Sequence, residues 1–361
     1  MARLGDVCKK GTSNIAQKDL EGHSGIYPIY GASGFITNVD FYQQENSYIA
    51  VVKDGAGIGR IMKLPAKSSV IGTMQYIIPN DTVDISYLAY AMEHMNLSKY
   101  FTGATIPHIY FKDYQKEELS LPPLDEQRKI AAVLDKVSSL IAKRRQQLDK
   151  LDELIKARFV EMFGDPVTNP NQWEKVPLSD LADVRIGPFG SLLHKEDYIA
   201  GGHPLVNPSH ILDDKIVVDK KLSVSEQKYA ELEPYHLKIG DVVMGRRGEM
   251  GRCAVVQYEG LLCGTGSLLI RTKGNVTADY IQKIISFPSF KKTIEDMAVG
   301  QTMPNLNVPI VSNFQIIKPP LQVQKKYYQF VEQTEKIKTT ISESLEKLET
   351  LKKALMQEYF G

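Results

Sequence analysis

Two glycine-rich segments of this chain carry basic side chains that could contact phosphate. The segments are Asp54-Gly-Ala-Gly-Ile-Gly-Arg60 and Gly245-Arg-Arg-Gly-Glu-Met-Gly251. Neither is a phosphate loop, because G-x-x-x-x-G-K-[ST] is absent and each segment runs into a strand-like sequence instead of opening a helix. We interpret both as turns between strands that present arginines. Ordinary hairpin turns with solvated arginines remain an equal alternative from the spacing alone.

Residue patterns that would support catalysis or a metal site are missing. The sequence contains no H-E-x-x-H, no paired C-x-x-C, no G-x-S-x-G and no Asp/Asn-Pro-Pro-aromatic segment. Its cysteines are Cys8, Cys253 and Cys263, an odd set without zinc spacing that fits a reducing cytosol. The missing motifs lower the expectation of an enzyme, and the cysteines favour a cytoplasmic protein.

Several loops combine basic, aromatic and small polar residues, a mixture suited to DNA. Arg and Lys neutralise phosphates, while Asn, Gln, Ser and Thr can bond base edges. Such loops include residues 9–14, 30–35 and 185–191 and a turn that occurs twice. For any single residue a solvated loop is the simpler reading, and the clustering carries the argument. The predicted DNA-contacting residues are Lys10, Ser13, Asn14, Ser33, Lys53, Arg60, Thr105, His108, Arg185, Phe189, Ser191, Arg246, Arg247, Arg252, Gln301, Asn305 and Asn307.

An internal repeat organises these loops. Pro122-Pro123-Leu124 with Gln127 returns, 197 residues later, as Pro319-Pro320-Leu321 with Gln324. The twice-occurring turn, residues 103–109 and 300–306, has the same offset. The chain is therefore two copies of one unit, each a globular segment followed by a long helix. A duplicated binder should meet a target with two related parts.

Apolar spacing predicts two long helices, over residues 125–162 and 322–359. About 38 residues at a rise of 1.5 Å give a rod of roughly 57 Å. The apolar positions of the first rod are Ile130, Leu134, Val137, Ile141, Leu148, Leu151, Ile155 and Met162, with Arg144 and Arg158 at two further positions of the same face. Those of the second are Phe330, Ile337, Ile341, Leu345, Leu348, Leu351 and Leu355. Neither helix can bury this face alone, so we expect an antiparallel intramolecular pair. Packing of each helix on its own domain, or homodimerisation, is the alternative.

The predicted fold class is α+β, with two globular domains joined by an antiparallel coiled coil and related by a rough internal two-fold axis. The predicted blocks are 1–120 and 165–318 for the globular domains, and 121–164 and 319–361 for the helical regions. Strands are expected over 48–52, 75–78, 215–218, 241–244 and 268–271, and shorter helices over 85–100 and 278–297.

Composition leaves the function open. A net charge of +1 argues against a strongly basic DNA-wrapping protein, although a basic patch can lie opposite acidic helices. No apolar stretch is long enough for a membrane span, and the start lacks a signal-peptide core. The near-zero charge supports an alternative hypothesis, a coiled-coil scaffold with two protein-binding domains.

The whole chain resembles the specificity subunits of type I restriction-modification systems. The resemblance is carried by Leu121-Pro-Pro-Leu-Asp-Glu-Gln127 before a long helix ending in Met162-Phe-Gly-Asp-Pro166, by residues 30–34 and 187–191, and by the terminal Tyr359-Phe-Gly361. It implies two target recognition domains that each read half of a bipartite double-stranded DNA site. It also implies methyltransferase subunits that dock on the helices and methylate adenine with S-adenosylmethionine. Restriction subunits are a further implied partner. The specificity subunit itself would then be non-catalytic, without a cofactor or metal, and ATP and Mg²⁺ would belong to partners.

One segment departs from the family pattern. The second domain is preceded by Asn171-Gln-Trp173-Glu-Lys-Val-Pro177-Leu, whereas the first domain starts directly at Leu4-Gly-Asp-Val7. From this difference we expect either a shortened N-terminus, with a weaker anchorage of the first domain, or a slightly different start.

Overall fold

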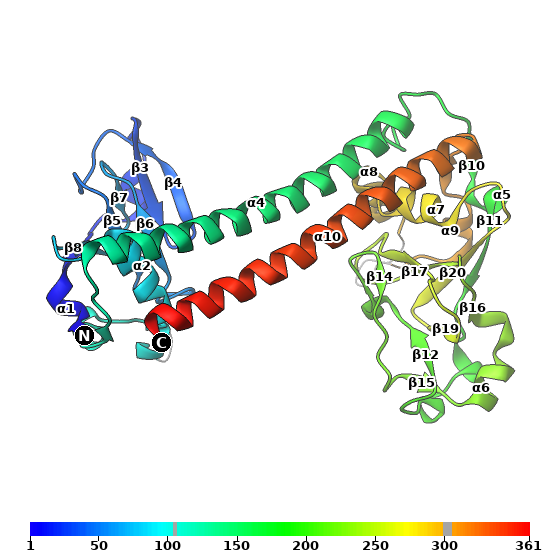
Figure 1. Ribbon diagram of the computed structural model, residues 1–361. Helices are drawn as coiled ribbons and strands as arrows, with labels where there is room; N and C mark the ends of the chain where they lie inside the picture. Colours follow the sequence, from blue (N-terminus) through cyan, green and yellow to red (C-terminus); the bar gives the residue numbers. More distant parts are fainter. Residues whose placement is uncertain (104–106, 299–304) are drawn as a thin grey trace. The chain divides into compact units, whose positions relative to one another are not determined.

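The computed structural model describes residues 1–103, 107–298 and 305–361, and its chain forms two compact units. Residues 1–149 and 339–361 make the first unit, and residues 150–338 make the second. Each long helix therefore contributes one part to each unit. Figure 1 shows the elements of both.

The first unit contains two small sheets. An antiparallel sheet has the order β2 (Cys8–Thr12), β8 (Met74–Pro79), β5 (Tyr48–Val52) and β6 (Ile61–Leu64). A second sheet has the order β4 (Gly34–Val39), β3 (Tyr27–Gly31) and β7 (Ser69–Val70), with β3 and β7 parallel. The strands predicted at 48–52 and 75–78 are confirmed. β5 is buried along its whole length, which explains its unbroken run of apolar residues.

Helix α2 (Ile85–His94) covers the first sheet and shares an apolar core with it. Asp84 caps the helix by accepting hydrogen bonds from the backbone N–H groups of Ser86 and Tyr87. The predicted helix was longer, to residue 100. Asn96 adopts a left-handed backbone (φ 51°) that ends the α-helix, and a short 3₁₀ turn follows. The remaining short elements are α1 (Leu4–Val7), α3 (Phe111–Tyr114) and the ribbon of β1 (Ala2–Arg3) with β9 (Glu118–Leu119).

The second unit repeats this arrangement, with a fourth strand in its second sheet. Its antiparallel sheet has the order β11 (Ala182–Ile186), β20 (Ser267–Thr272), β17 (Val242–Gly245) and β18 (Cys253–Val255). The other sheet has the order β15 (Ser223–Val224), β12 (His203–Val206), β19 (Leu261–Cys263) and β16 (His236–Leu237). Strands β12 and β19 are parallel, as β3 and β7 are in the first unit. The strands predicted at 241–244 and 268–271 are confirmed, whereas that at 215–218 is only β14 (Lys215–Ile216), paired with β13 (Ile211–Leu212).

The predicted helix over 278–297 is wrong as one element. It is two helices, α7 (Ala278–Ile285) and α8 (Pro288–Met297). Pro288 lacks an N–H and pushes Phe287 out of the helical region, to ψ 136°. The other helices are α5 (Leu178–Leu181), α6 (Glu226–Glu231) and α9 (Val308–Ser312), and β10 (Lys175–Pro177) pairs with β21 (Gln315–Ile317). The β1–β9 ribbon is its counterpart, so the first domain has a similar, shorter anchoring ribbon.

The two long helices are α4 (Leu124–Phe163) and α10 (Leu321–Phe360), within a residue or two of the predicted ends. They pack against each other in opposite directions in both units. In the first unit Arg145 Nη2 lies 2.6 Å from Glu349 Oε1. In the second, Lys338 Nζ lies 2.7 Å from Asp152 Oδ1, and Tyr327 donates to the Ile155 carbonyl at 3.3 Å. The antiparallel pairing predicted from the sequence is therefore observed.

Two positions of the predicted apolar face on α10 are wrong. Ile337 and Leu351 are 52% and 46% exposed. The neighbouring residues Lys338 and Lys352 lie on the packed face instead, with side chains only 22% exposed. Their aliphatic stems pack while the ammonium groups reach carboxylates, Asp152 for Lys338 and Glu93 for Lys352.

The repeated Pro-Pro-Leu-x-x-Gln segment fixes each long helix to a domain helix. Gln127 is fully buried, donates to the Pro122 and Thr82 carbonyls, and accepts from Asp84 N–H at 2.8 Å. Gln324 is also fully buried, donates to the Pro319 carbonyl and accepts from Thr277 N–H at 3.0 Å. Asp84 and Thr277 are the N-caps of α2 and α7. One amide in each repeat thus sets the start of both helices.

Candidate nucleic-acid interface

In the second unit the ends of three neighbouring strands, β11, β20 and β17, lie together at one end of the sheet. We call this end the loop edge of the unit. The backbone of Gly187, just after β11, donates to Ser267 at the start of β20. Arg246, just after β17, donates its N–H to the Gly266 carbonyl. The loops that follow β11 and β17 therefore flank the start of β20. Gly187 needs to be glycine, because a Cβ there would lie 2.0 Å from the Gly264 carbonyl oxygen.

Arg246, Arg247 and Asn305 come together at this edge. The Leu306 N–H donates to the Arg246 carbonyl, and Arg247 forms a β-bridge with Asn305. Arg246 Nε donates to Asn305 Oδ1 at 2.9 Å. Burial, followed by the charge of Arg247, lowers the pKa of Arg246. Two adjacent cations, one of them partly desolvated, make a local site that favours an anion such as a phosphate.

The first unit builds the same arrangement from different side chains. The Ile109 N–H donates to the Lys53 carbonyl, as Leu306 does to Arg246, and Asp54 forms a β-bridge with His108. Lys53 and Asp54 therefore occupy the places of Arg246 and Arg247, and His108 that of Asn305. The Lys53 ammonium lies 2.9 Å from one Asp54 oxygen, and His108 Nδ1 contacts the other.

A hollow of about 260 Å³ beside this turn gathers Lys10, Lys53 and His108. Lys112 and Tyr110 also line it, and neither was among the predicted contacts. Tyr110 is 47% exposed, with its ring 4.2 Å from that of His108, and Lys112 Nζ lies 5.3 Å from the Tyr110 ring. The alternation of basic and aromatic residues directly after the repeated turn could have revealed them.

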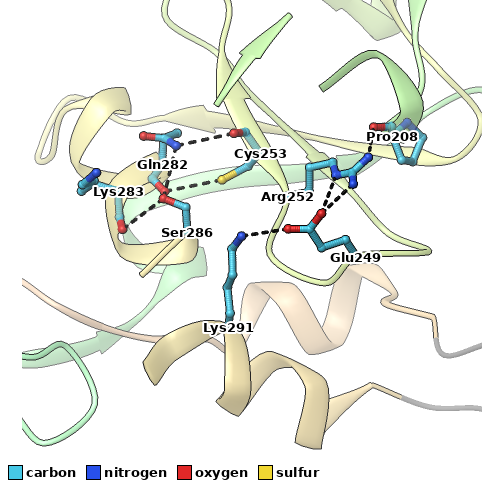
Figure 2. Close-up of polar contacts among 8 residues, drawn as sticks. All are labelled: Pro208, Glu249, Arg252, Cys253, Gln282, Lys283, Ser286 and Lys291. Carbon is cyan, nitrogen blue, oxygen red and sulfur yellow. Dashed lines mark hydrogen bonds and ion pairs between the residues drawn. The ribbon is translucent and has the colours of Figure 1, made fainter. Parts of the chain in front are cut away.

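Three of the predicted residues are used inside the protein. Ser13 is buried and its hydroxyl accepts from the Ile15 N–H at 3.3 Å. Asn307 caps α9 through the Ile310 N–H. Arg252 donates twice to Glu249 and once to the Pro208 carbonyl (Figure 2). We therefore assign these three structural roles.

Figure 2 also shows how the glycine-rich loop of the second unit is held. Glu249 Oε1 accepts from Lys291 on α8 at 3.1 Å, while Oε2 accepts from Arg252 at 2.6 Å. Hydrogen bonds from Arg252 and then from Lys291 lower the pKa of Glu249. A Cβ at Gly251, which also has a left-handed backbone (φ 75°), would lie 2.7 Å from Lys291 Cγ. The loop that carries Arg246 and Arg247 is thus fixed to the domain at its far end.

The remaining predicted residues form separate groups. Arg60 donates to the Ala32 carbonyl at 2.8 Å, which brings it next to exposed Ser33 in the turn between β3 and β4. Four exposed residues lie within or after β2 and β11, the first strands of the two antiparallel sheets: Asn14, Arg185, Phe189 and Ser191. Thr105 and Gln301 lie outside the described residues.

The described residues add little that points to other chemistry. No cluster of three or more His, Cys, Asp or Glu side chains suited to a metal occurs in residues 1–103, 107–298 and 305–361. In the same ranges no helix is both long and apolar enough to cross a bilayer. All three cysteines are buried, and burial raises the pKa of the Cys8 and Cys263 thiols to about 12, so neither is a ready nucleophile.

Known proteins of one kind resemble this chain over its whole length. It is 23% identical over 392 residues to the MjaVIII type I restriction enzyme specificity subunit of Methanocaldococcus jannaschii, covering 99% of this chain and 90% of the relative. A putative specificity subunit of Haemophilus influenzae is 21% identical, with 89% of this chain and 83% of the relative covered.

Solved structures agree on the fold. The S subunit of a type I restriction-modification system from M. genitalium matches with a TM-score of 0.63 at 14% identity, covering 100% of this chain and 95% of that one. A chain from a structure of type I system assembly and conformational transition matches with a TM-score of 0.59 at 16% identity, covering 99% and 96%.

The family model for the type I restriction modification DNA specificity domain matches twice, over residues 1–153 and 170–352. The two matches correspond to the two copies of the internal repeat. They do not favour the coiled-coil scaffold hypothesis. The chain therefore belongs to the type I restriction-modification DNA specificity family, in the role of a DNA sequence-specificity subunit.

Proposed function

We propose that each unit reads one half of a bipartite double-stranded DNA site and that the paired helices set the distance between the halves. The observation that carries this proposal is the repeated loop-and-turn arrangement. The same backbone hydrogen bonds hold Lys53 beside His108 in one unit and Arg246 beside Asn305 in the other. The same backbone arrangement with different side chains suits two domains that recognise different but related half-sites.

The chemistry at these edges is that of DNA contacts. Lysine and arginine neutralise phosphates and position a protein on the duplex, whereas polar side chains at the same edge can reach bases. Both kinds occur in each unit, with Lys10 and Lys112 added in the first. A net charge of +1 means that this basic character is local, since acidic side chains elsewhere balance it.

Catalysis is assigned to partner subunits. Methyltransferase subunits would dock on α4 and α10 and methylate adenine with S-adenosylmethionine, and restriction subunits with ATP and Mg²⁺ would join them. Hollows beside the helices support docking, one of about 840 Å³ in the second unit and one of about 620 Å³ in the first. Charged residues of both helices line each hollow, including Asp152 and Lys338 in one and Arg145 and Glu349 in the other.

A footprint tests the proposal. The chain is co-purified with its methyltransferase partner, mixed with genomic fragments at moderate salt, and the retained DNA is sequenced after nuclease digestion. The expected result is two short protected segments with defined sequence, separated by a fixed interval of undefined sequence. Retention that shows no sequence preference at any salt concentration would contradict the proposal.

A further inference from the structure

The turn residues of the two units differ in the hydrogen-bonding group that they leave free. His108 and Asn305 are equivalent by the repeat and by their β-bridges to the preceding loop. In each case one polar atom of the side chain contacts a residue of that loop. The chemistry of this loop residue decides whether the remaining polar atom is a donor or an acceptor.

In the first unit the partner is a carboxylate. Asp54 can only accept hydrogen bonds, and the Lys53 ammonium 2.9 Å from its other oxygen favours the charged form. The His108 Nδ1 atom that contacts Asp54 therefore carries a proton. In a neutral imidazole the second nitrogen, Nε2, is then an acceptor. Burial, followed by the Lys53 charge, lowers the pKa of His108, which favours the neutral ring.

In the second unit the partner is a guanidinium. Arg246 Nε can only donate, so the Asn305 atom 2.9 Å away is its oxygen. The Asn305 amide nitrogen, which has two donor hydrogens, has no hydrogen-bond partner among the described residues. His108 Nε2 likewise has none in the described ranges. The same position thus offers an acceptor in one unit and a donor in the other.

We propose that His108 selects a base amino group in one half-site and that Asn305 selects a base acceptor in the other. In the major groove, amino donors are adenine N6 and cytosine N4, and acceptors are guanine O6 and N7, adenine N7 and thymine O4. Asp54 and Arg246 are positioning residues, since they fix which atom of the reading side chain is free. The inference rests on the proposed function, because it assumes that the two edges face DNA.

The first arm of the test uses the native protein and altered DNA. The complex with the methyltransferase partner is titrated at pH 8, where His108 is neutral, with duplexes whose adenines and cytosines are replaced one at a time by analogues lacking the amino group. One replacement in the half-site of the first unit should weaken binding about tenfold, the effect of one hydrogen bond left unmade. If no such replacement in that half-site changed affinity, the inference would be overturned, whatever the variants do.

The second arm changes the proton on His108. Asp54→Asn can offer its amide N–H to Nδ1, which moves the ring proton to Nε2 and turns the acceptor into a donor. This variant should prefer a base acceptor at the position where the native complex prefers an amino group. Asn305→Asp, which removes a donor, should relax selection only in the other half-site. Lys112→Gln is the control, because Lys112 lines the same hollow without contacting Asp54, and it should weaken all duplexes alike with a shallower salt dependence.

The outcomes separate the two proposals. Equal binding of cognate and unrelated duplexes by the native complex would remove the proposed function itself. A second outcome is that the native complex binds a specific sequence but folded Asp54→Asn keeps the same base preference. This outcome would leave the proposed function standing and would overturn only the assignment of His108. Circular dichroism and thermal melting establish that each variant is folded.

Discussion

At the scale of residues, the same backbone frame supports different side-chain charges in the two units. Arg246 and Arg247 stand where the first unit has Lys53 and Asp54. The first unit recovers positive charge from Lys10 and Lys112, which line the hollow beside His108. Each edge therefore keeps basic side chains while the side chain at the repeated turn changes.

Replacement of both Arg246 and Arg247 by alanine should weaken DNA binding by the complex. If they contact phosphates, the loss should be similar on all sequences, and the slope of log affinity against log salt should become shallower by about two. If they read guanines, the loss should be about 1–3 kcal/mol for each contact and confined to one half-site. Fluorescence anisotropy with cognate and unrelated duplexes separates these outcomes.

Arg252→Ala is the matched control, since its guanidinium is used inside the loop. If the double variant bound both duplexes with native affinity, Arg246 and Arg247 would be excluded as contacts.

Glu249 should make stability depend on pH. Because its pKa is lowered in the folded protein, its contribution is present above the ordinary carboxyl pKa and is lost as pH falls through the folded value. Glu249→Gln should lower the free energy of unfolding by about 0.5 kcal/mol at pH 7, as expected for exposed ion pairs. The difference from the native protein should disappear at an acidic pH below the lowered folded pKa. Urea titrations at pH 7 and at the acidic pH test this, with Glu259→Gln, at an exposed position, as the control. A difference that persisted at the acidic pH would argue against the ion pairs.

At the scale of elements, the two buried glutamines are the joints between domain and helix. Each bonds the backbone at the start of a long helix and the N-cap of a domain helix. Their repetition at an offset of 197 residues now has a structural reason. In each repeat two prolines precede the long helix, and the glutamine one turn into the helix donates to the carbonyl of the first proline.

Gln127→Ala and Gln324→Ala should each destabilise the protein by about 1–3 kcal/mol, because buried backbone groups lose their partners. The Gln127 variant should lose more, since that amide makes three bonds and Gln324 makes two. Thermal unfolding measures both, with Gln146→Ala on the exposed face of α4 as control. A cost no larger than that of the control would refute this role.

The long helices were the most predictable elements, because their apolar pattern repeats over about ten turns and their ends are marked by Pro and Gly. Even so, Ile337 and Leu351 were misplaced by one position, since lysine stems can occupy a packed face that hydrophobicity alone assigns to isoleucine or leucine. The interface was less predictable. Ser13, Arg252 and Asn307 have residue types suited to DNA, but local bonds use them, and sequence spacing does not reveal such bonds.

Insertion of one heptad into both α4 and α10 should lengthen the spacer of the recognised site. Seven residues add about 10.5 Å to each helix and keep the packed face in register. Since B-DNA rises about 3.4 Å per base pair, the spacer should grow by about three base pairs. Sequencing of methylated host DNA reads the spacer directly. An unchanged spacer in a folded, active complex would refute the idea that the helices set the distance.

At the scale of the whole molecule, duplication links fold and function. Two units share strand order, the parallel pair in the second sheet, the anchoring ribbon and the glutamine joint. They differ at the edges where DNA is proposed to bind. A single chain can then recognise a composite site with no two-fold symmetry in sequence, because each half is read by a different set of side chains.

The most direct test of this account is the methylome of a host that co-expresses the chain with its methyltransferase partner. N6-methyladenine should appear in one split motif, with two short defined halves around a gap of fixed length. Methylation at a single continuous motif, or no new methylation despite a folded complex, would contradict the account of two units reading two half-sites.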